Sequence, residues 1–340
     1  MSNQNPEVTA VGIGSAGSRI VSLLSKQSLL IDKFAYVSCD RGDLEAESGE
    51  KVLIESPVDQ KLNPSLVRGL ALKSIPRISN AVAGSKVVLA VAGLGGATGS
   101  GLAPLVASIA QGSGAIPVGV AVMPFDYEKK LKFHAGVSLR RLREAARGVI
   151  VVDNDTLMRS SPDDSTLTGL YESANREAAK ALGGLLSRSS ESSVPVGINK
   201  VLGTVLQEGY SLLGISTSDS SDKAEEALAG AVISIAKLAE TKEASRAVVI
   251  LKGDGSLSAS EVGLAVKRLG SMINNEGVDI EYGVSYSGTS QLQVSLLASG
   301  FKSTKYDEYD PLQKILAGRS IDDEMDSSVI EGLEKIPACD

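Results

Sequence analysis

Apolar residues stand at consecutive rather than alternate positions in five short runs of the first half of the chain. Such runs predict strands that are buried on both faces, as in a parallel sheet covered by helices. Between them, apolar residues recur every three to four positions, which predicts helices, for example over 18–27 and 101–111. The predicted strands cover residues 8–14, 34–40, 86–93, 116–123 and 148–154.

In the second half of the chain, apolar runs and helical patterns alternate less regularly. A helical pattern over 165–187 leads into a Ser-rich stretch, and three further helices and three strands follow. We therefore predict an α/β fold whose first domain is a doubly wound parallel sheet, with ligands beyond the carboxyl ends of its strands. The predicted units are a nucleotide-binding domain over 1–165, a central helix and hinge over 166–190, a smaller α+β domain over 191–302, and an acidic tail over 303–340.

The amino-acid composition narrows the possible classes of protein and of function. The 340 residues are 43% hydrophobic, and no apolar run approaches the ~18 residues of a membrane span. The first residues lack the pattern of a signal peptide, so we expect a soluble, cytoplasmic protein. Two cysteines and one histidine exclude a disulfide framework and suit zinc poorly. A net charge of −7 and the absence of Trp argue against nucleic-acid binding.

The first glycine-rich loop follows the strand predicted at 8–14. Gly12, Gly14 and Gly17 satisfy G-x-G-x-x-G, and Asp40 ends the next strand. This arrangement fits an NAD-type dinucleotide fold. It fits other nucleotide folds equally well, and a tight turn that needs glycine for packing would also produce it.

A second glycine-rich loop separates these alternatives. Residues 96–101, "GATGSG", have the glycine spacing of a P-loop, but Leu102 and Ala103 stand where Lys and Ser or Thr are required. A dehydrogenase has no need for a second phosphate loop. Two loops that each open a helix predict a triphosphate cradle built from backbone amides and helix N-termini.

The stretch "AGLGGATGSGLAP", residues 92–104, resembles the signature G-G-G-T-G-[ST]-G of tubulins, FtsZ and the CetZ proteins. Further ordered matches identify the chain as a member of this superfamily, similar to a divergent prokaryotic FtsZ, over nearly all of 8–300. These matches are "VGIGSAGSRIV" (11–21), "VSCDRGDL" (37–44), "NPSLVR" (63–68), "MPFDYEKK" (123–130), "YESAN" (171–175), and the segments 246–262 and 282–300.

The resemblance implies binding of GTP or GDP with Mg²⁺, and head-to-tail stacking of subunits around the nucleotide. It places Glu128 at the ribose, Tyr171 at the base, and Asp40 near the phosphates and the magnesium region, without fixing a metal ligand. The nucleotide site that it implies comprises Gly14, Ser15, Ala16, Gly17, Arg19, Asp40, Gly95, Gly96, Ala97, Thr98, Gly99, Ser100, Glu128, Lys132, Tyr171, Asn175 and Arg176.

The chain departs from the family pattern around the nucleotide. Ala97 replaces a signature glycine, and residues 56–64 contain no glycine where FtsZ has a glycine-rich loop. Arg176 replaces the acid that accepts hydrogen bonds from guanine, although arginine has no acceptor. Either Arg176 forms an exposed i, i+4 ion pair with Glu172, or Glu172 or Asn175 takes over recognition of the base.

A further departure concerns hydrolysis. The family presents two acids from the helix entering the second domain, and these positions hold Gly197 and Lys200 here. Residues 192–207 contain no Asp or Glu, so we assign no catalytic residue and expect weak or absent hydrolysis. Whether the chain is a GTPase therefore stays open, and a partner subunit that carries the acids would restore the site.

We interpret the chain as an FtsZ/tubulin-like cytoskeletal protein that assembles with itself or with an FtsZ-like partner. The alternatives are a GTP-binding scaffold that does not polymerise and, third, an NAD-dependent oxidoreductase. The basic segment 129–147 is either a solvated helix face or a site for an anionic partner. The tail sequence 333–338, "LEKIPA", faintly resembles the FtsZ peptide that binds membrane tethers.

Overall fold

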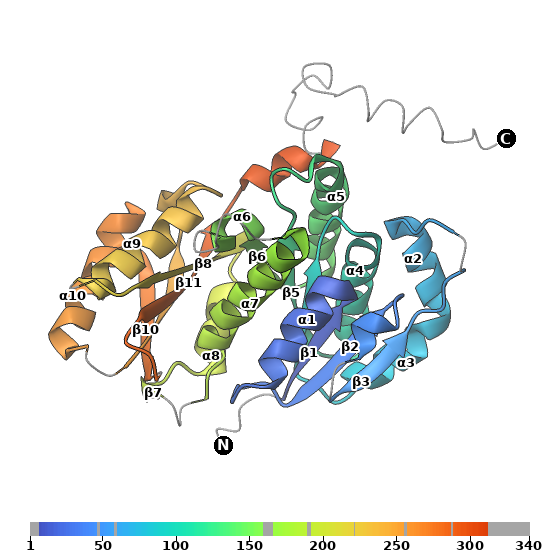
Figure 1. Ribbon diagram of the computed structural model, residues 1–340, viewed down its shortest axis with the longest axis horizontal. Helices are drawn as coiled ribbons and strands as arrows, with labels where there is room; N and C mark the ends of the chain where they lie inside the picture. Colours follow the sequence, from blue (N-terminus) through green and yellow to red (C-terminus); the bar gives the residue numbers. More distant parts are fainter. Residues whose placement is uncertain are drawn as a thin grey trace.

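A single twisted sheet runs through the whole molecule (Figure 1). Its strands lie in the order β3-β2-β1-β4-β5-β6-β8-β11-β9-β10-β7. The two halves of the sheet join where β6 pairs in parallel with β8, at Ile150↔Ser211 and Val151↔Leu212. The computed structural model describes residues 7–45, 48–57, 60–158, 166–188, 192–220, 222–254, 257–286 and 288–311.

The first half of the sheet is the predicted doubly wound domain. All its neighbouring strands are parallel, and both β1 and β6 are buried at every position, which explains their uninterrupted apolar sequences. The strand order reverses between β1 and β4, so these neighbours send their chains to opposite sides. The strands are β1 (Val8–Ile13), β2 (Lys33–Ser38), β3 (Glu50–Leu53), β4 (Val87–Gly93), β5 (Ile116–Met123) and β6 (Gly148–Asp153).

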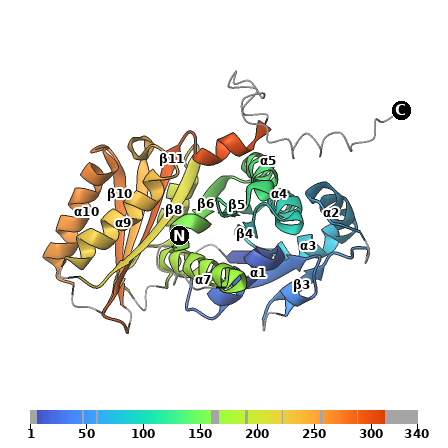
Figure 2. The same cartoon turned by 45° about the horizontal axis from the view of Figure 1, so that its top comes forward.

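Helices cover both faces of the sheet (Figure 2). One face packs in a core with Ile20 of α1 and Leu182 of α7, and the other packs with Leu102 of α4 and Leu139 of α5. The first face carries α1 (Gly14–Ser25), α7 (Leu167–Leu185) and α8 (Ile198–Val205). The second carries α2 (Pro64–Ala71), α3 (Ile75–Val82), α4 (Ala97–Gly112) and α5 (Lys129–Ala145), while the short α6 (Asn154–Leu157) follows β6.

The second half of the sheet is mixed, as expected for an α+β unit. Its strand β11 pairs antiparallel with both β8 and β9, whereas β9 and β10 are parallel. Two helices cover one side (Figure 1). The elements are β7 (Ser192–Val194), β8 (Tyr210–Ser218), α9 (Lys223–Ala236), β9 (Arg246–Gly253), α10 (Ala259–Ile273), β10 (Asp279–Tyr286) and β11 (Leu292–Phe301).

Strands β3, β7 and β8 were not predicted from the sequence. The strands β3 and β7 are short and lie at the two ends of the sheet. Strand β8 contains Gly214, a residue that weakens the strand pattern. A Cβ on Gly214 would lie 2.4 Å from the carbonyl oxygen of Ala231, so the glycine lets α9 pack against the strand.

The beginning of the predicted tail is part of the fold. Residues 302–310 lead from β11 back to α5 through a 3₁₀ helix, η6 (Lys305–Tyr309), in which Tyr306 is buried. The two elements α5 and η6 are in contact. Residues 312–340, which include the segment compared with tether-binding peptides, lie outside the described residues.

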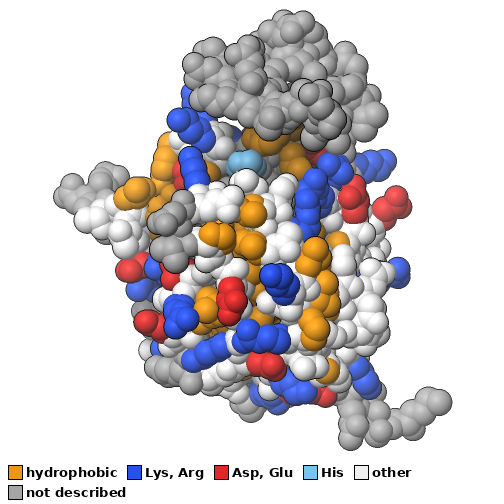
Figure 3. All heavy atoms as spheres, turned by 90° about the vertical axis from the view of Figure 1, so that its right-hand side faces the viewer, with side chains coloured by type: hydrophobic (Ala, Val, Ile, Leu, Met, Phe, Trp, Pro, Cys, Tyr) orange, Lys and Arg blue, Asp and Glu red, His pale blue; other side chains and the backbone are white. Residues whose placement is uncertain are grey.

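Charged side chains are mixed on the surface. On the face shown in Figure 3, Lys and Arg lie scattered among Asp, Glu and apolar side chains instead of gathering into one basic area. Among the described residues, no helix combines the length and the apolar character that crossing a membrane requires.

We expect Leu102→Ala to lower the free energy of unfolding by about 2–5 kcal/mol, because it leaves a cavity under α4. Leu102 is fully buried in α4, whereas Leu72 is 58% exposed. The control Leu72→Ala should cost less than about 0.5 kcal/mol. Urea unfolding of the full chain measures both, and equal effects of the two variants would contradict this account of the core.

Candidate functional site

Two glycine-rich loops meet at the point where the strand order reverses. The first connects β1 to α1, and the second connects β4 to α4. The strands β1 and β4 are hydrogen-bonded neighbours, with Ile13 opposite Ala92. In open α/β sheets, ligands bind beyond the carboxyl ends of the strands at such a reversal. The topology therefore places both predicted loops at the expected site.

The first loop needs glycine for conformation and for close packing. Gly14 has a φ of +66°, in the left-handed region that favours glycine. A Cβ on Gly17 would lie 2.1 Å from the carbonyl oxygen of Val91, so α1 packs directly on the β4 backbone. A Cβ on Gly14 would lie 3.3 Å from the Thr98 side chain and the Gly99 nitrogen. The two loops are therefore in contact with each other.

The second loop is held by its own hydrogen bond. Gly95, with a φ of +113°, donates its N–H to Oγ of buried Ser100 over 2.8 Å. Ser138 of α5 donates its hydroxyl to the Ser100 carbonyl oxygen over 2.6 Å. The Gly95 amide and the Ser100 hydroxyl, both predicted to line phosphates, thus also stabilise the loop, while Gly96 is exposed at its rim.

The remaining loop positions form the open side of the site. Ser15 and Arg19 are exposed on α1, and Ala16, Ala97 and Thr98 are partly exposed. The replacement Ala97 begins α4 as an ordinary helical residue and is absent from the positive-φ positions. This helical conformation explains why alanine is tolerated there.

The end of β2 adds a carboxylate next to the loops. Asp40 is exposed, and its Oδ1 accepts a hydrogen bond from the Gly42 N–H over 2.9 Å. Its neighbour Cys39 is half-buried beside Thr98. Burial raises the pKa of the Cys39 thiol, the hydrogen bond with Thr98 opposes this shift, and the charge of Asp43 adds to it. The contact between Cys39 and Thr98 therefore links the end of β2 to the second loop.

The predicted ribose and base residues contact each other. The Tyr171 hydroxyl donates a short hydrogen bond to Oε1 of Glu128, and the Phe125 N–H donates to Oε2 over 2.8 Å. The Tyr171 ring packs edge-on against Phe125, with the ring centroids 5.5 Å apart. Burial, and then the Glu128 carboxylate, raise the pKa of Tyr171, so its hydroxyl remains a donor at neutral pH. Each carboxylate oxygen keeps capacity for a further donor.

Helix α7 presents the other predicted base residues. Asn175 is buried, whereas Glu172 and Arg176 are exposed. Glu172 and Arg176, both within the described part of α7, form no ion pair with each other. The interpretation of this pair as a surface salt bridge is therefore wrong.

Lys132 contacts the end of the chain. Its ammonium lies 3.1 Å from Oδ1 of Asp126 and 4.9 Å from the centre of the Tyr309 ring. Burial by itself lowers the pKa of Lys132, but the hydrogen bonds with Tyr309 and Asp126 together raise it above its ordinary value. The structure thus places Lys132 beside the 125–128 turn and η6.

The sequence analysis did not single out Asn154. This residue follows β6 directly, is 7% exposed, and has a buried Oδ1 without a hydrogen-bond partner. A buried carbonyl oxygen without a partner is costly, which marks it as a place for an additional donor. The polar pair Asn154–Asp155 at the end of a fully buried strand was the available signal.

The predicted lost catalytic positions lie on the second half of the molecule. Gly197 is exposed at the N-terminus of α8 and has open space where a Cβ would stand. Lys200, one turn later, donates a 2.6 Å hydrogen bond to Oε2 of Glu281 on β10. The cation therefore has a carboxylate partner within its own chain.

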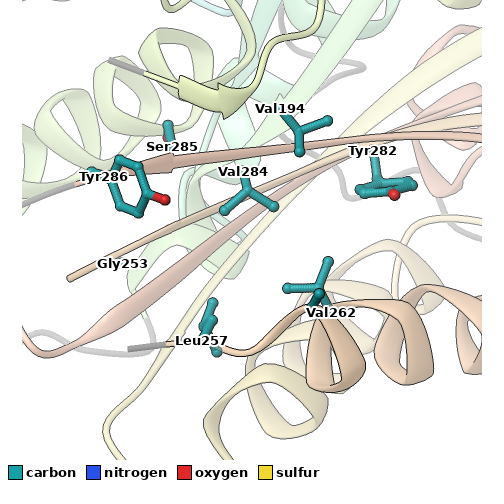
Figure 4. A pocket seen from close by; sticks show the side chains of 9 residues that line it. Val194, Gly253, Leu257, Val262, Tyr282, Val284, Ser285 and Tyr286 are labelled. Carbon is teal, nitrogen blue, oxygen red and sulfur yellow. The ribbon is translucent and has the colours of Figure 1, made fainter. Parts of the chain in front are cut away.

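A groove of about 240 Å³ opens between β10, β7 and α10 (Figure 4). Tyr282, Val284 and Tyr286, at alternate positions of β10, line it together with Val262 and Val194. The two tyrosines are 41% and 51% exposed, so this end of the sheet presents accessible apolar surface.

Comparisons with known proteins support the resemblance to the tubulin/FtsZ family. The family model "Tubulin/FtsZ family, GTPase domain" matches residues 60–162, which include the second loop and the 125–128 turn. Over these residues the chain is similar to the tubulin/FtsZ family. A curated relative, the cell division protein FtsZ of Haloferax mediterranei, is 28% identical over 96% of this chain and 80% of the relative. FtsZ 1 of Methanocaldococcus jannaschii is 27% identical over 79% of this chain and 75% of the relative.

Solved structures support the tubulin/FtsZ fold over most of the chain. A mutant form of FtsZ from M. jannaschii has a TM-score of 0.78 at 26% identity, covering 87% of this chain and 92% of that one. A protofilament of CetZ2 from Haloferax volcanii with bound GTPgS has a TM-score of 0.70 at 22% identity, covering 92% and 99%. The fold class predicted from the sequence is confirmed.

We expect alanine at Gly99 and at Gly69 to have opposite effects on stability. A Cβ on Gly99 would lie 2.1 Å from the Gly93 carbonyl oxygen, whereas one on Gly69 meets nothing within 4 Å. Gly99→Ala should therefore lower the free energy of unfolding by about 1–3 kcal/mol. Gly69→Ala, on an exposed helix, should raise it by about 0.5–1 kcal/mol. Thermal unfolding measures the sign, and a stable Gly99→Ala variant would show that the loops need no such close approach.

Proposed function

We propose that the chain binds GTP or GDP with Mg²⁺ between the two glycine loops. The observation that carries the proposal is their contact, through Gly14 on one side and Thr98 and Gly99 on the other. Each loop opens a helix at a strand reversal, so the unpaired N–H groups of two helix N-termini converge on one anion site. A triphosphate has phosphate groups for both helix N-termini, so it matches this site better than a single phosphate does.

The remaining contacts follow from chemistry and position. Ser15, Ala16 and Gly17 would line the phosphates opposite Gly96, Ala97 and Thr98. Glu128 would accept hydrogen bonds from the ribose hydroxyls, and Tyr171 would pack beside the base. Asn175 is the best candidate to recognise the base, because its amide offers both acceptor and donor groups. Arg19 and Arg176 offer donors only.

The carboxylate of Asp40 fits a nucleotide-bound Mg²⁺. This ion usually takes one or two protein carboxylates and completes its shell with phosphate oxygens and water. The described residues contain no group of three or more His, Cys, Asp and Glu that could hold a metal by themselves. Asp40 is exposed at the carboxyl edge, with Oδ1 engaged by Gly42 and Oδ2 available. The ion would neutralise phosphate charge while Asp40 orients it.

We further propose that copies of the chain assemble head to tail. Two similar structures, of FtsZ from M. jannaschii and of CetZ2 from H. volcanii, are a dimer and a protofilament. In this chain, the loops lie at the carboxyl edge of the sheet, and the exposed groove lies on the second half, beside β7. Accessible apolar surface of this kind supports a self-association site.

Hydrolysis by such an assembly should be weak. The positions that correspond to the family's acids carry Gly197, without a side chain, and Lys200, a donor. The Glu281 carboxylate is engaged in an ion pair with Lys200 within its own chain. The nucleotide would act as a structural link between subunits.

The nucleotide that copurifies with the full chain tests both parts of the proposal. We expect gentle purification, denaturation and chromatography to release mostly GTP, because the chain holds the triphosphate without cutting it. Release of mostly GDP would contradict weak hydrolysis. Release of an NAD-type cofactor would contradict the GTP site itself.

Restoring acids should increase turnover. Gly197→Asp, alone and with Lys200→Asp, introduces carboxylates where the structure leaves open space or removes a donor. We expect phosphate release to rise at least about tenfold, equivalent to ~1.4 kcal/mol in the barrier. Gly112→Asp, an equally open glycine on α4, is the control and should not change turnover.

Sedimentation with and without GTP separates an assembling protein from a scaffold that does not polymerise.

A further inference from the structure

The segment 302–310, which we call the strap, carries the chain from the second half of the molecule back to the first. Three hydrogen bonds hold it to the second half, the first from the Lys302 N–H to Oε2 of Glu243 over 2.8 Å. The Lys305 N–H donates to the Leu238 carbonyl oxygen over 2.8 Å, and the Tyr210 hydroxyl donates to Oδ1 of Asp307 over 2.8 Å. Figure 2 shows the strap between β11 and α5. Residues 302–307 of the strap are thus anchored to the second half.

The strap fits closely against α5. A Cβ on Gly136 would lie 2.4 Å from the Tyr309 carbonyl carbon, so α5 has a glycine where the strap backbone crosses it. Next to this crossing, Arg140 donates a 2.6 Å hydrogen bond to Oδ2 of Asp310, whose side chain is 2% exposed. Because one partner of this pair is buried, the contact is not a weak surface ion pair.

The strap also reaches the turn that holds Glu128. Lys305 donates a 2.8 Å hydrogen bond to Oδ2 of buried Asp153, and its ammonium lies 3.8 Å from Oδ1 of Asp126. The Tyr309 hydroxyl donates to the same Asp126 oxygen over 3.4 Å. Asp126 is therefore contacted by two strap side chains.

The Lys305 ammonium offsets the negative charge of three neighbouring carboxylates, those of Asp126, Asp153 and Asp155. Asp126 lies beside Asp155, whose Oδ2 accepts the Asp126 N–H over 2.9 Å, and Asp153 accepts the Asp155 N–H over 2.9 Å. Burial, and then the charges of Asp153 and Asp126, raise the pKa of Asp155. Without the Lys305 charge, Lys132, 3.1 Å from Oδ1 of Asp126, would remain to offset the repulsion at Asp126, and the compensation would be weaker.

The position of Asp126 determines that of Glu128. The turn 125–128 is closed by a 2.9 Å hydrogen bond from the Glu128 N–H to the Phe125 carbonyl oxygen. The Phe125 N–H in turn donates to the Glu128 carboxylate. Asp126 is one of the two residues inside this turn, so a shift of Asp126 moves the carboxylate.

We infer that Lys305 and Tyr309 of the strap are positioning residues for ribose recognition by Glu128. They hold Asp126 and thereby fix the Glu128 carboxylate. The inference rests on the proposed GTP site. It means that a segment following the second half of the fold contributes to nucleotide selectivity in the first half.

The test compares GTP with 2′,3′-dideoxy-GTP, which lacks the two ribose hydroxyls. Dissociation constants are measured by calorimetry on the nucleotide-free full chain, for the wild type, Lys305→Met, Lys305→Arg and Lys302→Met. Lys302 is an exposed strap lysine and serves as the control. We expect the wild type to prefer GTP. Lys305→Met should weaken GTP binding about five- to tenfold and change dideoxy-GTP binding less than twofold, and Lys305→Arg should restore the preference.

Tyr309→Phe removes only the hydroxyl contact and should cause a smaller loss of the same kind. Equal weakening of both nucleotides by Lys305→Met would indicate a purely structural strap and overturn the inference, as would an unchanged preference. A wild type that binds both nucleotides equally would overturn it as well, since Glu128 would then not read the ribose. A wild type that binds neither nucleotide would instead overturn the proposed function.

Discussion

Direct packing of peptide groups, without side chains between them, determines the architecture of the site. Gly17 lies against the Val91 carbonyl group, and Gly99 lies against that of Gly93. These contacts let α1 begin directly at the end of β1, and α4 begin with three residues between it and the end of the neighbouring β4. Their first N–H groups therefore converge, although the two helices pack on opposite faces of the sheet. Every other proposed contact with the nucleotide is arranged around this convergence.

The part of the fold that could be predicted is the part with strong local patterns. Strands such as β1 and β6 are buried on both faces and therefore read as continuous apolar runs. The loop glycines could be predicted because backbone conformation and close approach allow few alternatives at Gly14 and Gly17. Strand β8 was missed, since its Gly214 serves the packing of α9 and breaks the strand pattern.

The pairwise contacts of the site could not be predicted in the same way. Glu128 and Tyr171 were both expected at the nucleotide, but nothing local indicates that they bond to each other across 43 positions. The contact between Gly136 and Tyr309 and that between Lys200 and Glu281 join still more distant segments. A sequence pattern shows which side chains are buried or charged, whereas the partner of each is determined by the tertiary fold.

The basic segment of α5 illustrates this difference. The interpretation of a solvated face fits Lys129 and Lys130, which are exposed, whereas other cations of the segment have partners within the chain. Arg140 pairs with Asp310, Arg143 lies over the Tyr210 ring at 4.1 Å, and Lys132 contacts Asp126. Three of the cations thus hold neighbouring parts of the same chain.

The joint between the two halves of the sheet has a mechanical consequence. The pairing of β6 with β8 is short, and a short ladder by itself is a flexible joint about which the halves could twist. The chain crosses between the halves again at Asp310, in a pair with Arg140, and at Lys305, in a pair with Asp153. Two attachments at separate places resist torsion that one attachment permits. Twisting of one half against the other would therefore have to disturb two ion pairs with buried carboxylates as well as the backbone hydrogen bonds of the joint.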